Sequence, residues 1–325
     1  MKAPLKITSI LAAFLAATSA FATTSDVVGY VTIDLPAGNS TLSVPMLHEV
    51  SASAPTTAVE DSGGNTILTF SEGSFIAGAY DAVGGSSTHY AVISDGSNEG
   101  LVLDIASNTS STVTLTDAVA VAFSLTQNEN IIIREHIKIS DLIASATGLT
   151  PFVDALSFFN DDLSTDTYLW TGSNFVDNNF TSADSRPIYP GQGIVFFCQA
   201  PVSLVVTGGV STHDIKVPVY AGGSVNFIGT STPSSKIADG SEDVTLGSLG
   251  LGTQLTPFVG SVKLFATDGS LTSAPEQTYL WTGTNFVDGN FTNADDVAIE
   301  EYSAIVVSNN TDIYINIPEA YQENN

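Results

Sequence analysis

The sequence predicts a mainly β fold, with two related β-rich repeat domains, a small β-barrel or β-sandwich domain inserted in the first, and few short helices. Three observations lead to this prediction. Short runs rich in Val, Ile, Tyr and Phe alternate with clusters of Gly, Ser, Asn and Asp, as in strands joined by turns. A segment around Trp170 recurs near the C-terminus, and residues 51–128 have no counterpart in that second copy.

The repeat defines the domain boundaries. Residues 168–177 recur 111 positions later as residues 279–288, and residues 149–153 recur 106 positions later. A weaker match joins residues 31–39 to a segment 184 positions later, so the first copy contains an insertion. The predicted units are a first repeat at 23–50 plus 129–210, an insertion at 51–128 and a second repeat at 211–318.

The chain begins with the pattern of a secretory signal peptide over residues 1–22. Lys2 and Lys6 give a positive start, residues 7–17 are apolar, and residues 20–22 fit a small-residue cleavage site. No later apolar run approaches the roughly 18 residues that a membrane-spanning helix needs. We therefore expect an exported protein without a transmembrane segment, located extracellularly, at the cell surface or in the periplasm.

Alternating runs predict the strands of each unit in turn. In the insertion they lie at 66–70, 89–93, 100–105 and 112–115. In the first repeat a Ser followed by an apolar pair predicts one short helix over 139–145. Strands are then expected at 155–159, 167–170, 174–176 and 193–197. Gly172 predicts a tight hairpin after Trp170, and residues 319–325 form a polar tail.

The charge balance excludes one class of partner and restricts another. The 325 residues include 34 Asp and Glu against 8 Lys and Arg, for a formal net charge of -26. So few basic residues cannot form the stripe that neutralises nucleic-acid phosphates. Removal of residues 1–22 takes away two of the lysines and leaves the chain more acidic. Self-association through exposed sheet edges should therefore depend on divalent cations or acidification.

The sequence contains no local catalytic motif. The four histidines lie far apart, and none has the paired spacing of a zinc site. Cys198 is the only cysteine, so it cannot form an internal disulfide, and its apolar strand predicts a small buried residue. We predict no catalytic residues and no enzymatic activity, although catalytic groups can also assemble from distant loops.

Several short motifs together resemble a known family. They are the start at residues 26–31, the strand into residues 36–38, residues 90–96 with 99–101 in the insertion, the two Tyr-x-Trp-Thr-Gly hairpins, and Pro190-Gly191-Gln192-Gly193 before a hydrophobic strand. The chain resembles an uncharacterised family of secreted, β-rich bacterial repeat proteins. The resemblance implies an extracytoplasmic location and an unknown biochemical role, and it carries over no catalytic residue.

The repeated hairpins supply candidate carbohydrate-binding residues. Tyr168 and Trp170 alternate along one strand and share a face, as do Tyr279 and Trp281. Aromatic faces can stack on sugars, and the neighbouring Asn174 and Asn285 could hydrogen-bond hydroxyls. The alternative is that both tryptophans are core anchors, because a large aromatic side chain on a strand usually buries its area.

Carboxylates recur at related turns of the two repeats and supply candidate calcium ligands. These are Asp177 and Asp184 in the first copy, and Asp288 and Asp295 in the second. Calcium favours such carboxylate oxygens, but the spacing is not that of an EF-hand, and Asp is common in ordinary turns. Calcium is the one cofactor that the sequence suggests.

Five Asn-x-Ser/Thr sequons begin at Asn39, Asn108, Asn179, Asn290 and Asn309. They imply glycans only where the host has the machinery.

These features lead to three functional hypotheses. The first is an exported, non-enzymatic cell-surface or extracellular-matrix protein. The second is a carbohydrate-binding module that uses the paired Tyr/Trp hairpins and contacts cell-surface glycans. The third is a secreted hydrolase, which would need two carboxyl groups about 5 to 10 Å apart in a cleft.

Overall fold

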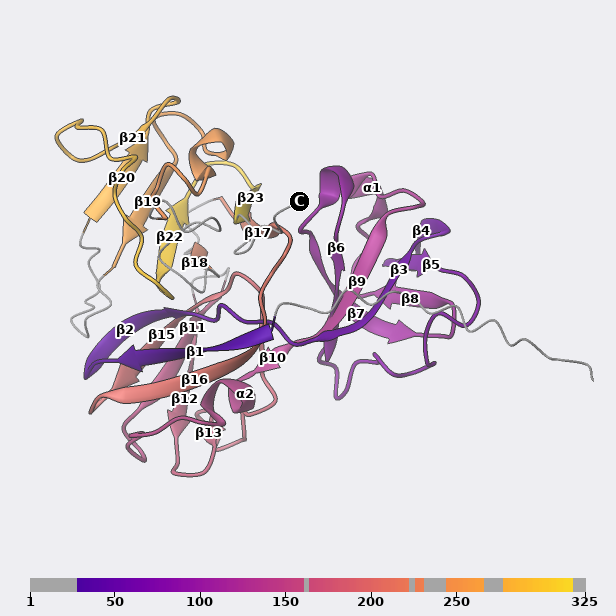
Figure 1. Ribbon diagram of the computed structural model, residues 1–325, viewed down its shortest axis with the longest axis horizontal. Coiled ribbons are helices and arrows are strands. Elements are labelled where there is room, and N and C mark those ends of the chain that lie inside the picture. Colours follow the sequence, from indigo (N-terminus) through magenta and orange to yellow (C-terminus); the bar gives the residue numbers. More distant parts are fainter. Residues whose placement is uncertain (1–27, 161–163, 222–225, 231–243, 266–276, 318–325) are drawn as a thin grey trace, which may run out of the picture.

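The computed structural model describes residues 28–160, 164–221, 226–230, 244–265 and 277–317 (Figure 1); the predicted signal peptide and polar tail lie outside these ranges. The prediction of a mainly β protein is confirmed. Within the described residues the helices are α1 (Ala120–Phe123), α2 (Ile139–Ile143), and the 3-10 turns η1 (Gly96–Asn98) and η2 (Leu251–Gln254). In this part of the chain no helix has the length and apolar character to cross a membrane.

The inserted unit is a seven-stranded antiparallel sheet, at the right of Figure 1. In hydrogen-bonding order its strands are β3 (Val50–Pro55), β9 (Asn130–Glu135), β6 (His89–Ile93), β7 (Val102–Asn108), β8 (Thr112–Leu115), β5 (Asn65–Thr69) and β4 (Ala58–Ser62). Alternate residues, such as Ile131 and Ile133 of β9, point into a core of their own. The predicted boundary, which placed residues 129–210 in the first repeat, is corrected here. Because β9 pairs with β3 and β6, residues 130–135 belong to the sheet of the inserted unit.

The first repeat is built on a five-stranded antiparallel sheet. Its order is β13 (Phe175–Val176), β12 (Thr165–Trp170), β11 (Ala155–Phe159), β15 (Gly193–Cys198) and β2 (Gly38–Ser43). Two ribbons complete it, β1 (Val28–Leu35) with β16 (Val202–Gly209), and β10 (Ile137–Lys138) with β14 (Pro187–Ile188). Leu42, Phe158 and Phe196 lie in its core, which α2 covers through Ile139 and Leu142. The predicted hairpin is present, with Trp170 opposite Phe175.

The second repeat has a sheet of the same strand order, made of the corresponding segments. The order is β21 (Phe286–Val287), β20 (Gln277–Trp281), β19 (Ser261–Leu264), β22 (Ala304–Ser308) and β18 (Asn226–Gly229). The ribbon of β17 (Ile215–Val219) and β23 (Ile313–Ile317) takes the place of β1 and β16. Trp281 lies opposite Phe286, as Trp170 lies opposite Phe175.

The three units converge on one region near the centre of Figure 1. The two repeats meet at their sheet edges, where Gln192 bridges to Ile228. Glycine is required beside this contact, because a Cβ on Gly193 would lie 2.6 Å from the ring of Phe227. The inserted unit joins the second repeat through a parallel bridge between Leu101 and Lys216. A turn of the first repeat, β7 of the insertion and β17 of the second repeat are thereby held together.

Candidate functional site

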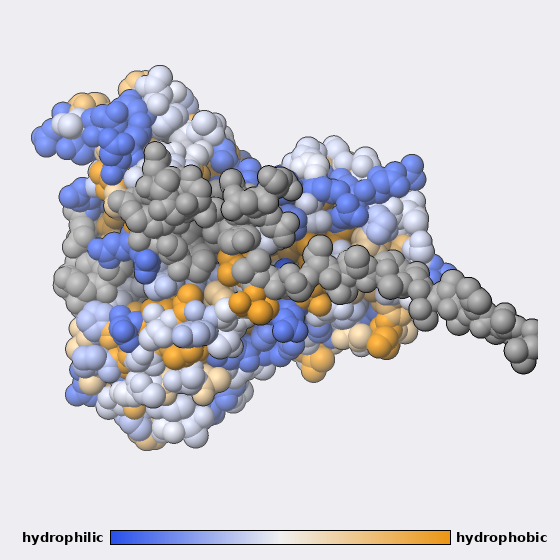
Figure 2. Space-filling view, viewed as in Figure 1, coloured by the Kyte–Doolittle hydropathy of each residue, from blue (hydrophilic) through white to orange (hydrophobic). Residues whose placement is uncertain are grey.

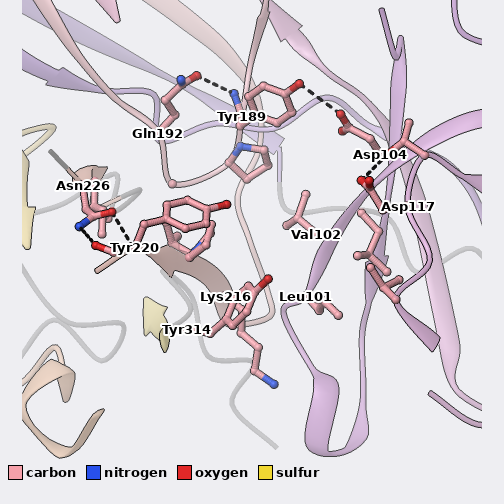
Figure 3. A pocket seen from close by; sticks show the side chains of 18 of the residues that line it. Leu101, Val102, Asp104, Asp117, Tyr189, Gln192, Lys216, Tyr220, Asn226 and Tyr314 are labelled. Carbon is pink, nitrogen blue, oxygen red and sulfur yellow. Dashed lines mark hydrogen bonds between the residues drawn. The ribbon is translucent and has the colours of Figure 1, made fainter. Parts of the chain in front are cut away.

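A cleft of about 710 Å³ lies at this convergence (Figure 3), within the range of roughly 300–1,000 Å³ that is usual for small-molecule sites. The space-filling view shows apolar surface gathered where the inserted unit meets the repeats (Figure 2). All three units line the cleft. Its main side chains are Val102, Asp104, Asp117 and Phe123 from the insertion, Phe159, Arg186, Tyr189 and Gln192 from the first repeat, and Lys216, Tyr220, Phe227 and Tyr314 from the second.

The wall from the first repeat is a tight turn between β14 and β15. The backbone amide of Tyr189 donates to Oε1 of Gln192 (3.2 Å), and the Gln192 amide donates back to the Tyr189 carbonyl (2.9 Å). Gly191 has a φ of 75°, and a Cβ there would lie 2.4 Å from Cγ2 of Val217. Glycine therefore lets the turn approach β17 closely enough to form one edge of the cleft.

The wall from the second repeat presents two tyrosine rings. The backbone amide of Tyr220 donates to Oδ1 of Asn226 (2.8 Å), and Nδ2 of Asn226 donates to the Tyr220 carbonyl (3.0 Å). Tyr314 packs edge to face against Phe123 of the insertion, with ring centroids 5.1 Å apart. Burial raises the pKa of Tyr314, so its hydroxyl stays protonated at neutral pH. Figure 3 shows Tyr189, Tyr220 and Tyr314 around the cleft, with Leu101 and Val102 opposite them.

A hydrogen-bonded chain crosses from the first repeat into the insertion behind this cleft. The Tyr189 hydroxyl donates to Oδ2 of Asp104 (3.1 Å), and Nε2 of His136 contacts Oδ1 of the same carboxylate (3.0 Å). Burial, followed by the nearby Asp104 charge, raises the pKa of Tyr189 to about 12. His136 is fully buried. Tyr189 is therefore a fixed hydrogen-bond donor, and its ring position depends on the inserted unit.

The two basic side chains in the described lining of the cleft are already engaged. Arg186 stacks over the ring of Phe158, 3.7 Å from its centroid, and its Nε donates to the Tyr168 hydroxyl (3.0 Å). Nζ of Lys216 donates to the Ser97 carbonyl (2.6 Å), and burial lowers its pKa. With both cations committed and two aspartates nearby, the cleft favours neutral hydroxyl-bearing ligands over phosphates.

The aromatic residues predicted to bind carbohydrate lie against the two cores. Trp170 packs on Phe175, with ring centroids 5.4 Å apart, and Trp281 packs on Phe286 at 5.2 Å. Tyr279 is only 2% exposed, so it offers no face to a ligand. The Tyr168 ring is half-buried between the core and Arg186. The geometry therefore matches the alternative of core anchors at these positions.

The two asparagines of these hairpins stabilise their turns. Oδ1 of Asn174 accepts from the Thr171 hydroxyl (2.6 Å), and Oδ1 of Asn285 accepts from the Thr282 hydroxyl (2.8 Å). Their side-chain oxygens are thus already used within the turn that each one belongs to.

The four predicted calcium ligands accept hydrogen bonds from main-chain amides. Asp184 accepts from the amide of Phe175 (3.1 Å), and Asp295 accepts from that of Phe286 (2.7 Å). Asp177 and Asp288 close the loops that follow β13 and β21. Among the residues that the structure describes, no three His, Cys, Asp or Glu side chains are grouped as a metal site would require. Calcium binding stays a prediction.

Cys198 is buried in the first core. Burial and then the Asp154 charge raise the pKa of its thiol to about 12. The thiolate is the nucleophilic form, so this cysteine is unreactive at neutral pH.

Comparison with protein-family models, curated proteins and solved structures found no match to this chain. The cleft therefore has to be interpreted from its own chemistry. No pattern in the sequence predicted the cleft, because its walls come from segments far apart in the chain. The one local signal was the Pro190-Gly191-Gln192-Gly193 turn, which the second repeat lacks.

Proposed function

We propose that the protein is an exported, non-enzymatic binding protein of the cell surface or extracellular matrix that holds a neutral saccharide of cell-surface glycans in the three-unit cleft. The observation that carries the proposal is the set of three tyrosines, Tyr189, Tyr220 and Tyr314, that line one cleft from two repeats. Their rings offer apolar faces, and the phenolic groups add polar tips. A pyranose ring has matching apolar faces and a rim of hydroxyls.

The polar groups of the cleft support the same ligand class. Asp117 supplies an acceptor, and Gln192 adds a side-chain amide beside the Tyr189 ring. A few fixed polar groups among aromatic walls is the usual composition of a small-molecule site. The engaged state of Arg186 and Lys216 favours an uncharged sugar over a phosphorylated one.

A glycan array followed by calorimetry on the mature protein tests this proposal. Tyr220→Ala and Tyr314→Ala should each weaken binding of the selected saccharide about tenfold or more, equivalent to about 1.4 kcal/mol. Tyr30→Ala is the matched control, because Tyr30 is 72% exposed on β1 and does not line the cleft. Loss of binding in Asn174→Ala, with both cleft variants unaffected, would move the site to the hairpins.

Two further measurements test the other parts of the proposal. Fractionation of producing cells should recover the protein with the envelope or matrix, and a purely cytoplasmic protein contradicts export. The bound saccharide should be recovered unchanged after prolonged incubation. A cleaved product whose formation requires Asp104 or Asp117 would instead indicate the hydrolase.

A further inference from the structure

The five sequons differ in whether the folded chain leaves the asparagine accessible. Asn108 and Asn309 are 6% and 7% exposed. Their side-chain nitrogens donate to main-chain carbonyls, Asn108 to Ile76 (2.8 Å) and Asn309 to Thr311 (3.1 Å). Asn39 lies inside β2, in register with β15. The fold therefore closes the sequons of Asn108 and Asn309 to a modifying enzyme, and it fixes Asn39 in a paired, extended strand.

The remaining two sequons are exposed at equivalent loops of the two repeats. Asn179 lies in the loop that follows β13, and Asn290 lies in the loop that follows β21. The two loops are closed by matching bridges, Val176 to Ser182 and Val287 to Asn293. Each sequon asparagine, the residue after it and its threonine are all exposed.

An aspartate two positions before each asparagine organises the loop. Oδ1 of Asp177 accepts from the backbone amides of Asn179 and Thr181, both at 2.8 Å. Asp288 accepts from the amides of Asn290 (2.8 Å) and Thr292 (2.9 Å). The side chains of the asparagine and threonine lie beside the same carboxylate and help to lower its pKa. The acceptor amide, the hydroxyl and a carboxylate are therefore held together in both copies.

The middle residue of each sequon is an exposed phenylalanine in a strained conformation. Phe180 and Phe291 have φ values of 60° and 61° and are each 72% exposed. A bulky residue at positive φ costs energy, and an exposed phenyl ring leaves apolar area in water. A sugar attached to the neighbouring asparagine would cover that ring.

We propose that Asn179 and Asn290 are a duplicated pair of N-glycan acceptor sites. The donor is a saccharide activated at C1 by a lipid-linked phosphate or pyrophosphate. The side-chain nitrogen of the asparagine forms a bond to C1, and the C1–O bond to phosphate breaks. The phosphate leaves with the bonding electron pair, and the amide loses one proton to a base of the transferase. No electron transfer is involved.

The test is mass spectrometry of peptides from the protein recovered from the exported fraction of its producing cells. Saccharide mass should be found on the peptides containing Asn179 and Asn290, and none on those containing Asn39, Asn108 or Asn309. Unmodified asparagine at both exposed positions overturns the proposal, and so does modification of the buried pair.

Threonine variants test whether modification of Asn179 requires the sequon threonine or only an exposed asparagine in this loop. Thr181→Ala should abolish the modification of Asn179 and leave that of Asn290 intact. Thr181→Ser, which keeps the hydroxyl, should retain it. Both variants keep the backbone amide that donates to Asp177, so the loop is preserved. Continued modification of Asn179 in Thr181→Ala would contradict the sequon chemistry.

Discussion

Replacement of Asp154 by alanine should destabilise the first repeat by about 2–3 kcal/mol. Asp154 is fully buried, and its two oxygens accept from the backbone amides of Thr150 and Gln199, both at 2.8 Å. A hydrogen bond to a charged group contributes about 1.5–3 kcal/mol, so two bonds give about 3–6 kcal/mol. Part of this is offset because alanine no longer buries a carboxylate.

In the second repeat, the backbone amide that corresponds to that of Thr150 finds its acceptor in a different segment. The position corresponding to Asp154 is Gly260, and the amide of Thr256 donates instead to Oδ1 of Asn309 (3.0 Å). Asn309 corresponds to Cys198 of the first repeat, whose pKa is raised by the nearby Asp154 charge. The side chain at position 198 is therefore close enough to replace the lost acceptor.

Cys198→Asn in the Asp154→Ala background should then restore the amide contact of Thr150. One neutral hydrogen bond contributes about 1 kcal/mol, so a double-mutant cycle should give a favourable coupling of about 1 kcal/mol. The Gln199 amide stays unsatisfied, and the rescue is partial. Cys198→Asn alone should be destabilising, because Asp154 already occupies the acceptor position.

The assay can follow each repeat separately, because the chain has two tryptophans and each packs against a different core. In a Trp281→Phe background, the fluorescence of Trp170 during urea unfolding reports the first repeat. Separate probes matter because a chain with three cores need not unfold in one transition. The changes in unfolding free energy caused by Asp154→Ala and Cys198→Asn could instead simply add, to within about 0.5 kcal/mol. That result would refute the equivalence of Asp154 and Asn309.

Three further predictions concern the cleft and the acidic loops. Gly191→Ala should weaken saccharide binding, because its Cβ would lie 2.4 Å from Val217; Gly84→Ala, also at positive φ but with open space around it, is the control, and equal losses of binding would contradict the steric argument. Asp104→Asn should lower the pKa of Tyr189 from about 12 toward 10, measured by ultraviolet titration of tyrosinate, and an unchanged midpoint would mean that burial alone sets the value. The pKa values of Asp177 and Asp288 are lowered from 3.8 by hydrogen bonds from main-chain amides, so their contribution to stability is present above 3.8 and is lost as pH falls through the folded-state values. The double variant Asp177→Asn/Asp288→Asn keeps an acceptor oxygen and should flatten the acid side of the urea-midpoint profile; an unchanged slope there would show that other carboxylates dominate.

Local pattern predicted the individual elements well, but apart from the hairpin at Gly172 it did not predict which strands pair. The helix expected at 139–145 is α2, and the hairpin at Gly172 joins β12 to β13 as expected. The apolar run at residues 130–133 is part of β9, whose pairing with β3 and β6 depends on residues far away in the chain. Periodicity reports which faces are buried, and it contains no information on which strand lies alongside.

For the candidate site, local sequence pattern was even less informative than for the strand pairing. Tyr168 and Trp170 share a strand face, but alternation alone could not distinguish a face toward solvent from one toward the core. Likewise, an Asp at a turn can bind a calcium ion or accept a hydrogen bond from a backbone amide, and the residue type does not distinguish the two roles. Asp184 accepts from the amide of Phe175. The cleft forms only where the three units meet, so the pattern of any single segment could not predict it.

Comparison of the two repeats indicates why the cleft belongs to the assembled chain. Gly191 and its counterpart Tyr302 both have positive φ, at 75° and 55°, so this turn does not itself need glycine. What needs glycine at 191 is the close approach of Val217 from the other repeat. Tyr189 is likewise held by Asp104 of the insertion, whereas its counterpart in the second repeat is Glu300. At positions 189 and 191 the first copy thus departs from the second, and each of these residues is placed by contact with another unit, Tyr189 with Asp104 of the insertion and Gly191 with Val217 of the second repeat.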